Sequence, residues 1–540
     1  MILAQQREKL SKKAQKGRAK AKTLPPPYGG LNTRDSLADM EETDAAVLQN
    51  YWSSKTSVDA RKGYTPWTSS IIGYVETLMA YSGSTTNKLF AATSAGTIYG
   101  VTTQDSYLTD ENGNYVTTED GRTLVIETAG SSTDVTGLTN GRWQYVNFAT
   151  SGGNYLISAN GADDVRSYDG TTWATPTITG VTSANLVHVN AHKERLWFVE
   201  NGSLRAWYLP TKSIAGAASA LDLRSVARKG GYLMAMGTWT IDAGYGVDDL
   251  AVWITSNGEV IVYRGTDPAS ATTWALVGIW EIGSPLGRRC FLKWGGDLLV
   301  INRDGVLPMS AALQSSRVNH SVALTDKIKP TFSEAALNYA SNFGWQLVFY
   351  PNANQLILNV PEVERNRQVQ YAMNTIKKTW WPFSGWNAGC WEVFNDILYF
   401  GGYQLVGRAW NSNADAGTDI SVRGIQAFNY LNKAGIEKRV TAFETVFYTS
   451  GSPSVFGGVN VDFDTTENDS SLETRTSLYG TWDTGKFDSA LWAPAIDLRK
   501  SWNGARGVGN AFAPTINADI NGIELQWVNS TIVYEEGAFL

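Results

Sequence analysis

The stretch from Leu250 to Gly265, L-A-V-W-I-T-S-N-G-E-V-I-V-Y-R-G, constrains the fold more than any other part of this sequence. Two runs of β-branched and aromatic residues, Ala251 to Ile254 and Val260 to Tyr263, flank Ser256-Asn257-Gly258. Because Asn and Gly tolerate the positive φ angles of a tight turn, the stretch predicts a β-hairpin. Neither run alternates cleanly between apolar and polar residues, so we expect both faces of the hairpin to be buried, as when one small sheet stacks on another.

The same pattern recurs along the chain, with two short apolar runs around a turn that contains Gly or Asn. The seven copies are Lys88–Gly100, Tyr155–Tyr168, Arg195–Tyr208, Leu250–Gly265, Asp297–Met309, Gln346–Val360 and Ile397–Trp410, with turn residues Gly96, Gly161, Gly202, Gly258, Gly305, Asn352 and Gly402. Successive turns are about 40 to 65 residues apart, and a four-stranded propeller blade takes roughly 40 to 50 residues.

This spacing predicts an irregular β-propeller of about six to eight blades in residues 72–424. The widest interval contains an insert, Asp105–Glu127, that itself has the pattern of a hairpin with turns at Asn112-Gly113 and Asp120-Gly121. The alternative is a set of β-sandwiches whose hairpins are spaced by chance.

The composition favours a mostly β protein, because 21 Trp, 24 Tyr, 18 Phe and 52 Gly against 7 Met suit short strands and tight turns. A chain of 540 residues has room for two or three domains. We expect an N-terminal platform segment in residues 28–71 and a sandwich-like β-domain in residues 425–540 that packs with it. No run approaches the roughly 18 apolar residues of a membrane span, and no apolar region of a secretion signal follows the basic start.

Two segments are candidates for helices. Ser36 is a candidate cap for a short helix with Leu37, Met40, Val47 and Leu48 on one face, although Ala46–Trp52 fits a strand equally well. Thr325–Ser341 is the best helix candidate, with Ser333 as cap and Ala336, Leu337 and Ala340 on one face.

The first 22 residues form a basic block whose cations are Arg7, Lys9, Lys12, Lys13, Lys16, Arg18, Lys20 and Lys22. With Glu8 the block carries a net charge of +7, which leaves −13 for the rest of a chain whose total is −6. Such a block is either a solvated, flexible arm or an arm that docks on protein or nucleic acid. The following Thr23-Leu24-Pro25-Pro26-Pro27 predicts a stiff linker, so residues 1–27 are interpreted as arm and linker.

The residues that commonly carry catalysis are sparse. His188, His192 and His320 are the histidines, and V-H-V-N-A-H around the first two is strand-like, so they lack the geometry of a zinc helix. Cys290 and Cys390 lie in apolar surroundings and predict buried, inert thiols. The sequence contains no phosphate-binding loop, nucleophile elbow or dinucleotide fingerprint, and we expect no metal and no cofactor.

Acidic residues leave one enzymatic alternative, since a glycosidase requires only two carboxylates across the scissile bond. The candidates are Asp163-Asp164, Asp248-Asp249 and the cluster Asp462, Asp464, Glu467 and Asp469. Ser167-Tyr168-Asp169-Gly170-Thr171-Thr172-Trp173 is faintly similar to the turn repeats of sialidase-type propellers. Adjacent Asp residues before a strand are far more often part of a solvated turn, and the 462–469 cluster lacks the spacing of a calcium loop. A carbohydrate-binding or carbohydrate-cleaving propeller is therefore kept as the alternative function.

The order of several motifs resembles the tail nozzle, or tail tubular, proteins of short-tailed bacteriophages. The motifs are R-D-S-L-A-D-M at Arg34–Met40, A-A-V-L-Q-N-Y-W at Ala45–Trp52, R-K-G-Y at Arg61–Tyr64, L-T-D-K-I-K-P before Gln346–Val360, V-Q-Y-A-M-N-T-I-K-K-T-W-W-P-F at Val369–Phe383 and W-D-T-G-K-F-D-S-A-L-W at Trp482–Trp492. The resemblance covers most of residues 28–540 and depends on the shared order of the motifs. The basic arm departs from the family pattern.

The resemblance implies a structural protein of the virion without enzymatic activity. Such a protein is made in the host cytoplasm and forms a homohexameric ring in the short tail. The ring would contact adaptor and portal ring proteins, dock tail fibres or spikes, and touch the host envelope only indirectly. Double-stranded DNA would pass through it during ejection without sequence-specific binding.

The charge of the body suits such a conduit. A Lys or Arg that neutralises a phosphate adds salt-dependent affinity, which would slow passing DNA. We therefore expect the chain without residues 1–22 not to bind duplex DNA, and the bore of the ring to carry more Asp and Glu than Lys and Arg.

Overall fold

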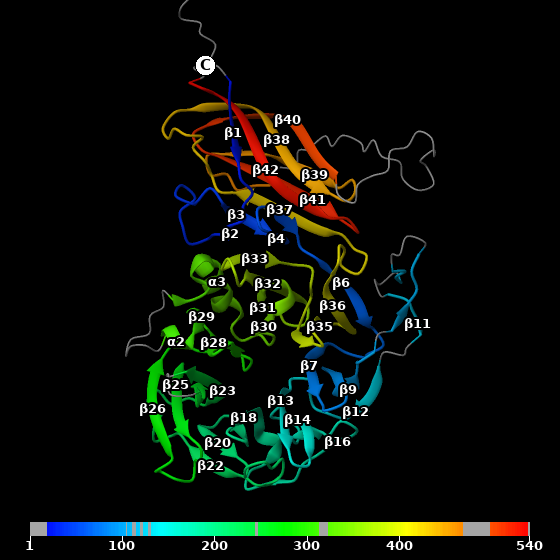
Figure 1. Cartoon of the computed structure of the whole chain (residues 1–540), viewed down its shortest axis with the longest axis vertical. Helices are drawn as coiled ribbons and strands as arrows, with labels where there is room; N and C mark the ends of the chain where they lie inside the picture. Colours follow the sequence, from blue (N-terminus) through cyan, green and yellow to red (C-terminus); the bar gives the residue numbers. More distant parts are fainter. Residues whose placement is uncertain are drawn as a thin grey trace, which may run out of the picture. The chain divides into compact units, whose positions relative to one another are not determined.

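The computed structural model describes residues 19–103, 105–110, 115–118, 123–127, 131–242, 247–312, 322–467 and 497–537 (Figure 1). It divides into two compact units, one formed by Met1–Arg61 with Asp419–Leu540 and the other by Lys62–Thr418. We call the first the two-sheet unit and the second the ring unit. Strands dominate both units, so the prediction of a mostly β protein is confirmed.

The described part of the ring unit contains seven consecutive antiparallel sheets of three or four strands. The first sheet consists of β7 (Val75–Ser82), β8 (Asn87–Thr93), β9 (Thr97–Gly100) and β12 (Ser132–Val135). The second consists of β13 (Gln144–Thr150), β14 (Gly153–Ala159), β15 (Arg166–Tyr168) and β16 (Trp173–Ala174). The third consists of β18 (Leu186–His192), β19 (Arg195–Glu200), β20 (Arg205–Tyr208) and β22 (Ser219–Asp222). The next two are β23 (Leu233–Asp242), β24 (Val247–Thr255), β25 (Glu259–Gly265) and β26 (Trp274–Glu281); and β27 (Phe291–Trp294), β28 (Asp297–Asn302) and β29 (Gly305–Pro308). The last two are β30 (Gln346–Tyr350), β31 (Gln355–Val363), β32 (Arg367–Asn374) and β33 (Thr379–Phe383); and β34 (Cys390–Phe394), β35 (Ile397–Gly402) and β36 (Leu405–Ser412), completed by β6 (Gly63–Thr68).

The sheets follow one another around a ring (Figure 1). The first strand of each sheet lies next to the first strand of the following sheet, and β34 of the seventh sheet lies next to β7 of the first. Strand β6 comes from the start of the unit and pairs with β36 at its end. The sequence analysis placed residues 63–68 outside the propeller region, and this pairing shows that they complete its last sheet.

Apolar cores join the first sheet to the second and the seventh, and join the second to the third, the third to the fourth and the fourth to the fifth. This packing explains why these strands are continuous apolar runs. In β24, Val252 and Ile254 pack toward the fifth sheet, whereas Ala251 and Trp253 pack toward the third. All four side chains are fully buried. Both faces of the hairpin are therefore covered, as the sequence predicts.

The predicted turns are mostly where the sequence places them. Gly96, Gly161, Gly202 and Gly258 have positive φ in turns between two strands of one sheet, and Gly305, also with positive φ, is the first residue of β29 directly after such a turn. The prediction that Asn352 is the key turn residue is wrong, because Asn354 has the left-handed conformation, with a φ of 51°. Gly402 ends β35, and Gln404 takes the positive φ in its place. The sixth hairpin also differs from the others, because it joins the first two strands of its sheet.

The insert in the first sheet is a hairpin, as predicted. β10 (Ser106–Tyr107) pairs with β11 (Val125–Glu127), and bridges join Thr109 to Tyr115 and Thr117 to Thr123. The predicted turn residues Asn112-Gly113 and Asp120-Gly121 lie outside the described residues. A further short parallel pair joins β17 (Ile178–Thr179) to β21 (Gly216–Ala217).

The main helix differs in detail from its prediction. α3 spans Lys329–Tyr339, so Ser333 lies inside the helix and does not cap it. Pro330 is in the first turn, where a missing N–H costs nothing, so the helix begins earlier than the sequence suggests. Phe332, Ala335 and Ala336 are buried, whereas the predicted face residue Leu337 is 80% exposed. The other short helices are α2 (Met309–Ala312), η1 (Ser183–Asn185), η3 (Asp326–Ile328) and η4 (Pro351–Ala353).

The two-sheet unit combines both ends of the chain. One sheet has the order β4 (Tyr51–Ser53), β5 (Val58–Ala60), β42 (Leu525–Glu536), β38 (Lys438–Thr449) and β40 (Asp497–Gly509), with β1 (Lys20–Leu24) also paired to β42. The other has the order β2 (Gly30–Leu31), β3 (Asp44–Gln49), β37 (Ile420–Gln426), β41 (Phe512–Ile520) and β39 (Ser454–Val461). Gly424 of one sheet lies against Trp527 and Tyr51 of the other, where a Cβ would come within 3.1 and 3.2 Å of their rings.

Two features of the two-sheet unit test predictions from the sequence: a helix-or-strand alternative near the N-terminus and a domain boundary. The helix considered after Ser36 would have included Val47 and Leu48. These two residues lie in strand β3, and β4 follows it, so the strand alternative for residues 46–52 is confirmed. β37 begins at Ile420 and pairs with β3, so the predicted domain boundary at residue 424 falls inside a strand.

The end of the predicted basic arm is also a strand. Lys20–Leu24 pairs along its whole length with β42, and Leu24 is buried. Lys20 lies 2.6 Å from Glu536, and Lys22 lies 3.1 Å from Glu42. These residues were predicted to belong to a flexible arm and linker, and this is wrong because the strand pairing gives their backbone hydrogen-bond partners. Arg7, Lys9, Lys12, Lys13, Lys16 and Arg18 lie outside the described residues.

Candidate functional site

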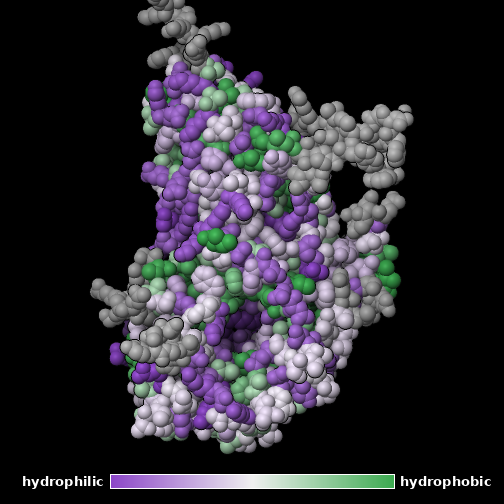
Figure 2. Space-filling view, in the orientation of Figure 1, coloured by the Kyte–Doolittle hydropathy of each residue, from purple (hydrophilic) through white to green (hydrophobic). Residues whose placement is uncertain are grey.

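A cavity of about 570 Å³ lies at the centre of the ring unit. It is lined by residues in or beside the first strand of every sheet, from β7 to β34. The space-filling view shows a hollow with a hydrophilic lining at this place (Figure 2). Polar side chains from all seven sheets therefore line one central cavity. Such a cavity can hold a ligand, or its side chains can form hydrogen bonds between the sheets.

Arg289 is the most connected of these side chains. Its guanidinium donates to the carbonyl of Glu76 at 2.9 Å, to the Thr77 hydroxyl at 2.6 Å and to the carbonyl of Trp143 at 3.4 Å. It also donates to Oε1 of Gln346 at 3.4 Å. These groups belong to the first, second and sixth sheets, whereas Arg289 precedes the fifth. Burial lowers the pKa of Arg289, and the acceptors around it compensate the buried charge.

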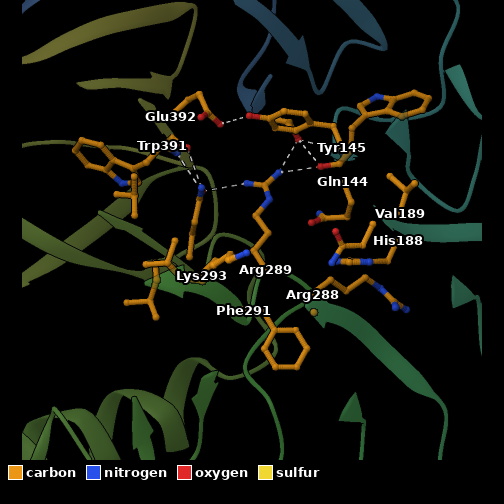
Figure 3. Close-up of a pocket in the computed structure, with 18 of the residues that line it drawn as sticks. Gln144, Tyr145, His188, Val189, Arg288, Arg289, Phe291, Lys293, Trp391 and Glu392 are labelled. Carbon is orange, nitrogen blue, oxygen red and sulfur yellow. Dashed lines mark hydrogen bonds between the residues drawn. The ribbon is translucent and has the colours of Figure 1, made fainter. Parts of the chain in front are cut away.

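The preceding residue, Arg288, points to the other side of the ring (Figure 3). It donates to the carbonyl of Met234 at 3.1 Å and to the Asn201 side chain at 3.3 Å. Met234 belongs to the fourth sheet, and Asn201 lies between two strands of the third. Two consecutive arginines therefore tie the fifth sheet to five others, and we call this pair the arginine clamp.

Gln346 and Tyr145 extend the clamp to the seventh sheet, and Figure 3 shows Tyr145 directed toward Glu392. Gln346 donates to the carbonyl of Trp391 at 2.8 Å and accepts from its N–H at 3.0 Å. The Tyr145 hydroxyl donates to Oε2 of Glu392 at 2.6 Å. Burial raises the pKa of Glu392 to about 7, although the Tyr145 hydrogen bond opposes the rise. The Glu392 carboxyl is thus the group of the cavity that titrates near neutral pH.

A second ionic group lies beside the clamp. Glu76 is 1% exposed and accepts from Arg142 at 3.0 Å, from Arg365 at 2.8 Å and from the N–H of Gly141 at 3.0 Å. The guanidinium of Arg142 also lies 4.5 Å from the centre of the Phe343 ring. A buried carboxylate with three donors is satisfied, and removal of one partner would leave an uncompensated charge.

The cavity is basic. Arg288, Arg289 and Lys293 line it against the single acidic side chain Glu392. His188 also lines it, but burial and the charge of Arg288 lower its pKa to about 3, so it is neutral at physiological pH. The negative total charge of the chain therefore does not describe its centre.

The acidic candidates from the sequence that the structure describes lie in turns, loops and strands. Asp163 accepts from the N–H of Thr139 at 2.9 Å, and Asp249 accepts from the Thr240 hydroxyl at 2.7 Å. Asp169 accepts from two N–H groups of its own turn, which lower its pKa. Asp464 does the same with Thr466, which lowers the pKa of Asp464. Asp164 is exposed, Asp469 lies outside the described residues, and the placed carboxylates come from different parts of the fold.

The other candidates of the sequence analysis have structural surroundings. Asp462 accepts from the N–H groups of Asn510 and Ala511, and Glu467 pairs with Arg423 at 2.6 Å. Cys290 and Cys390 are buried, and burial raises the pKa of each thiol to about 12. His188 and His192 lie on strand β18, and His320 lies outside the described residues.

Sequence reasoning missed the clamp. Arg288 and Arg289 lie just before the first strand of the fifth sheet, and Gln346 and Glu392 lie within the first strands of the sixth and seventh sheets. Arg288, Arg289 and Glu392 lie outside the seven hairpin regions, so the hairpin pattern carried no signal for them. Among the described residues no cluster of His, Cys, Asp and Glu is suited to a metal, and no helix is long and apolar enough to cross a membrane.

No protein-family model matches the sequence, and no curated protein does. Solved structures similar to the chain include the β-propeller domain of Cps50 (Swd1) from Myceliophteria thermophila, at 10% identity and a TM-score of 0.38 over 66% of this chain and 100% of that one. They also include BBS1N in complex with ARL6DN, at 9% identity and a TM-score of 0.35 over 65% and 97% of the two chains. A glycoside hydrolase family 43 arabinoxylan arabinofuranohydrolase from Bacillus subtilis is similar at 10% identity and a TM-score of 0.26 over 86% and 96%. With TM-scores this low, these likenesses carry no argument about fold or function.

Proposed function

We propose that this chain is a structural protein of a short phage tail, the nozzle that continues the DNA channel below the adaptor and portal. In this proposal the ring unit is a seven-bladed β-propeller, and the two-sheet unit is the platform through which copies assemble into a homohexameric ring. The order of motifs along residues 28–540 motivates the proposal.

The observation that carries the structural role is the arginine clamp. Arg288 and Arg289 use their donors in bonds between sheets, and the Glu392 carboxyl accepts from Tyr145. Hydrogen bonds to charged groups contribute about 1.5–3 kcal/mol each, so these bonds stiffen the ring at its centre. A stiff ring unit suits a part that must bear load while DNA passes through the assembly.

The outer face of the two-sheet unit supports the assembly role. Tyr448, Leu498, Trp502 and Val508 are exposed on β38 and β40, and Tyr448 pairs directly with Leu498. Trp502 lies opposite Glu444, and Val508 lies opposite Arg439, so the four side chains share one face of the sheet. Apolar patches rimmed by charge are typical of protein interfaces. The proposed occupant is a neighbouring copy or an adaptor subunit.

Electron microscopy of the purified chain, alone and mixed with the adaptor and portal ring proteins of its virion, tests the proposal. We expect six-fold rings in the mixture, attached coaxially to the portal assembly. Single copies in every mixture would contradict it. In such a ring the bore should carry more Asp and Glu than Lys and Arg, and a basic bore would favour a plug that retains the genome.

A carbohydrate-cleaving propeller is the second candidate. Asp163, Asp169, Asp249, Asp462 and Asp464 accept from N–H or hydroxyl groups, and Glu467 pairs with Arg423, which favours a structural role for each of them. Cleavage of host polysaccharide that is lost in Asp169→Asn or Asp249→Asn would favour the enzyme. Carbohydrate binding without cleavage requires neither of these carboxylates.

A further inference from the structure

A second cavity, of about 610 Å³, lies between the first and second sheets of the ring unit. Its walls come from β8, β9 and β12 of the first sheet and from β15, β16 and the turn between them in the second. This volume is within the roughly 300–1,000 Å³ of sites that bind small organic ligands.

One wall of this cavity is aromatic. Phe90 lies 4.8 Å from Tyr168 and 5.0 Å from Trp173 between ring centres, and Tyr168 lies 5.3 Å from Trp173. Phe90 and Tyr168 are fully buried and form a fixed base. Trp173 is partly exposed at the sheet edge, directly opposite Tyr168 in the strand register. The wall therefore contains a partly exposed indole that is in contact with two buried rings.

The rim of the cavity is polar and carries both signs of charge. The Lys88 ammonium lies 5.4 Å from the centre of the Tyr168 ring, and its interaction with the Tyr168 hydroxyl raises the pKa of Lys88. Asp134 is exposed and accepts from the Ser132 hydroxyl at 2.7 Å. Thr171 is also exposed at the rim. Donors and acceptors thus surround the aromatic wall.

Asp169 holds the turn that delivers Trp173. Its carboxylate accepts from the N–H groups of Thr171 at 2.8 Å and of Thr172 at 2.7 Å. The turn leads directly into β16, whose first residue is Trp173. Asp169 is thus a positioning residue. This assigns a role to the S-Y-D-G-T-T-W motif, which is not part of the arginine clamp.

We propose that this cavity binds a neutral oligosaccharide. The apolar C–H face of a sugar ring would stack on Trp173, and its hydroxyls would bond Lys88, Asp134 and Thr171. The opposite charges of Lys88 and Asp134 balance, which favours a neutral sugar over an acidic one. The site goes beyond the proposed nozzle function, because it requires neither ring assembly nor the tail.

Isothermal titration of the full chain with cellotriose, maltotriose and chitotriose tests the site. We expect saturable binding of at least one of these neutral trisaccharides. Trp173→Ala should weaken that binding about tenfold or more, because the stacking surface is lost. Trp502→Ala, which removes an exposed Trp of the two-sheet unit, is the matched control and should bind like the parent chain.

Asp134→Asn is the second variant, because its exposed side chain can change without disturbing the aromatic base. It should also weaken binding, with a circular dichroism spectrum and melting temperature like those of the parent. Failure of all three sugars to bind at millimolar concentration would overturn the proposal. Unchanged affinity in both folded variants would overturn it as well. Neither result bears on six-fold ring assembly, which microscopy tests separately.

Discussion

The two units bury the same kind of strand in different ways. In the ring unit, neighbouring sheets cover both faces of β24, so Val252 and Trp253 are buried although they point in opposite directions. In the two-sheet unit, Phe443 of β38 is buried, whereas Trp502 of the paired strand β40 is 55% exposed. The comparison shows that a strand between two neighbouring sheets can bury both of its faces, whereas the outer sheet of the two-sheet unit also carries exposed apolar residues.

The units also differ in how polar groups stabilise them. The ring unit concentrates buried polar groups at one centre, where Arg289 joins several sheets. In the two-sheet unit the outer ion pairs, such as Lys20 with Glu536, are partly exposed. Exposed pairs contribute little, about 0–1 kcal/mol, whereas a buried network is costly to break. The two units should therefore respond differently to matched substitutions.

The largest difference is expected for tryptophan. Trp253→Ala removes a fully buried indole that lies 5.3 Å from Trp197 between the third and fourth sheets. It should lower the free energy of unfolding of the ring unit by about 3–5 kcal/mol, as is usual for large-to-small core changes. Denaturant unfolding followed by hydrogen exchange in the ring unit measures this. A loss below about 1 kcal/mol would mean that the neighbouring sheets do not depend on this contact.

The next effect is expected at the arginine clamp. Arg289→Met keeps the length of the side chain but removes its hydrogen bonds to three other sheets, and should cost about 3 kcal/mol. The control is Arg439→Met on the outer face of β38, expected to change stability by no more than about 0.5 kcal/mol. Equal effects of the two substitutions in thermal unfolding would remove the distinction between the units.

The pH dependence of the ring unit should follow Glu392. Its folded pKa is about 7 and its ordinary value is 4.5, so the folded state binds the proton more tightly. Stability should therefore be highest below pH 4.5 with respect to this group and fall by roughly 2–3 kcal/mol as pH rises to 7. Glu392→Gln should flatten this part of the curve. A dependence that persists in the variant would assign it to another group.

Sequence reasoning identified the ring unit well because its physics is repetitive. Each hairpin needs a turn residue with positive φ and two buried faces, and both leave a local pattern, as at Gly258. The clamp leaves no local pattern, because Arg289, Gln346 and Glu392 meet only after the sheets close around them. Their polar side chains beside apolar runs were visible, but the partners of each residue depend on the fold.

The errors also have physical causes. Lys20 and Lys22 looked like part of a solvated arm, yet the edge of β42 gives them strand partners far away in sequence. Ser333 is a good cap by residue type, but Lys329-Pro330 starts the helix earlier. Asn352 was chosen by turn preference, although Asn354 takes the left-handed position. In each case a long-range contact or a competing local preference decided the outcome.

Two deletions at the basic N-terminus distinguish the role of residues 1–18 from that of strand β1. Deletion of residues 1–18 should leave β1 paired and stability unchanged, whereas deletion of residues 1–24 should cost about 2 kcal/mol, mainly from the buried Leu24. If the arm docks on a neighbouring ring or on DNA, both deletions should weaken that association, and the parent's affinity should fall with salt. Unchanged assembly and DNA binding after deletion of residues 1–18 would show a solvated arm without a ligand.

The smallest effect on stability, and the sharpest test of the comparison, is expected on the outer face of the two-sheet unit. Trp502→Ala should change the free energy of unfolding by no more than about 0.5 kcal/mol, because the exposed side chain loses few contacts. Its effect should appear in assembly, since a Trp buried at an interface often contributes about 2 kcal/mol or more to binding. Sedimentation velocity with the adaptor and portal proteins measures this, and the control is Thr441→Ala, which changes an exposed residue of β38. If Trp502→Ala assembles like the parent, the apolar face is a surface without this partner, and the role of the two-sheet unit in ring formation must lie elsewhere.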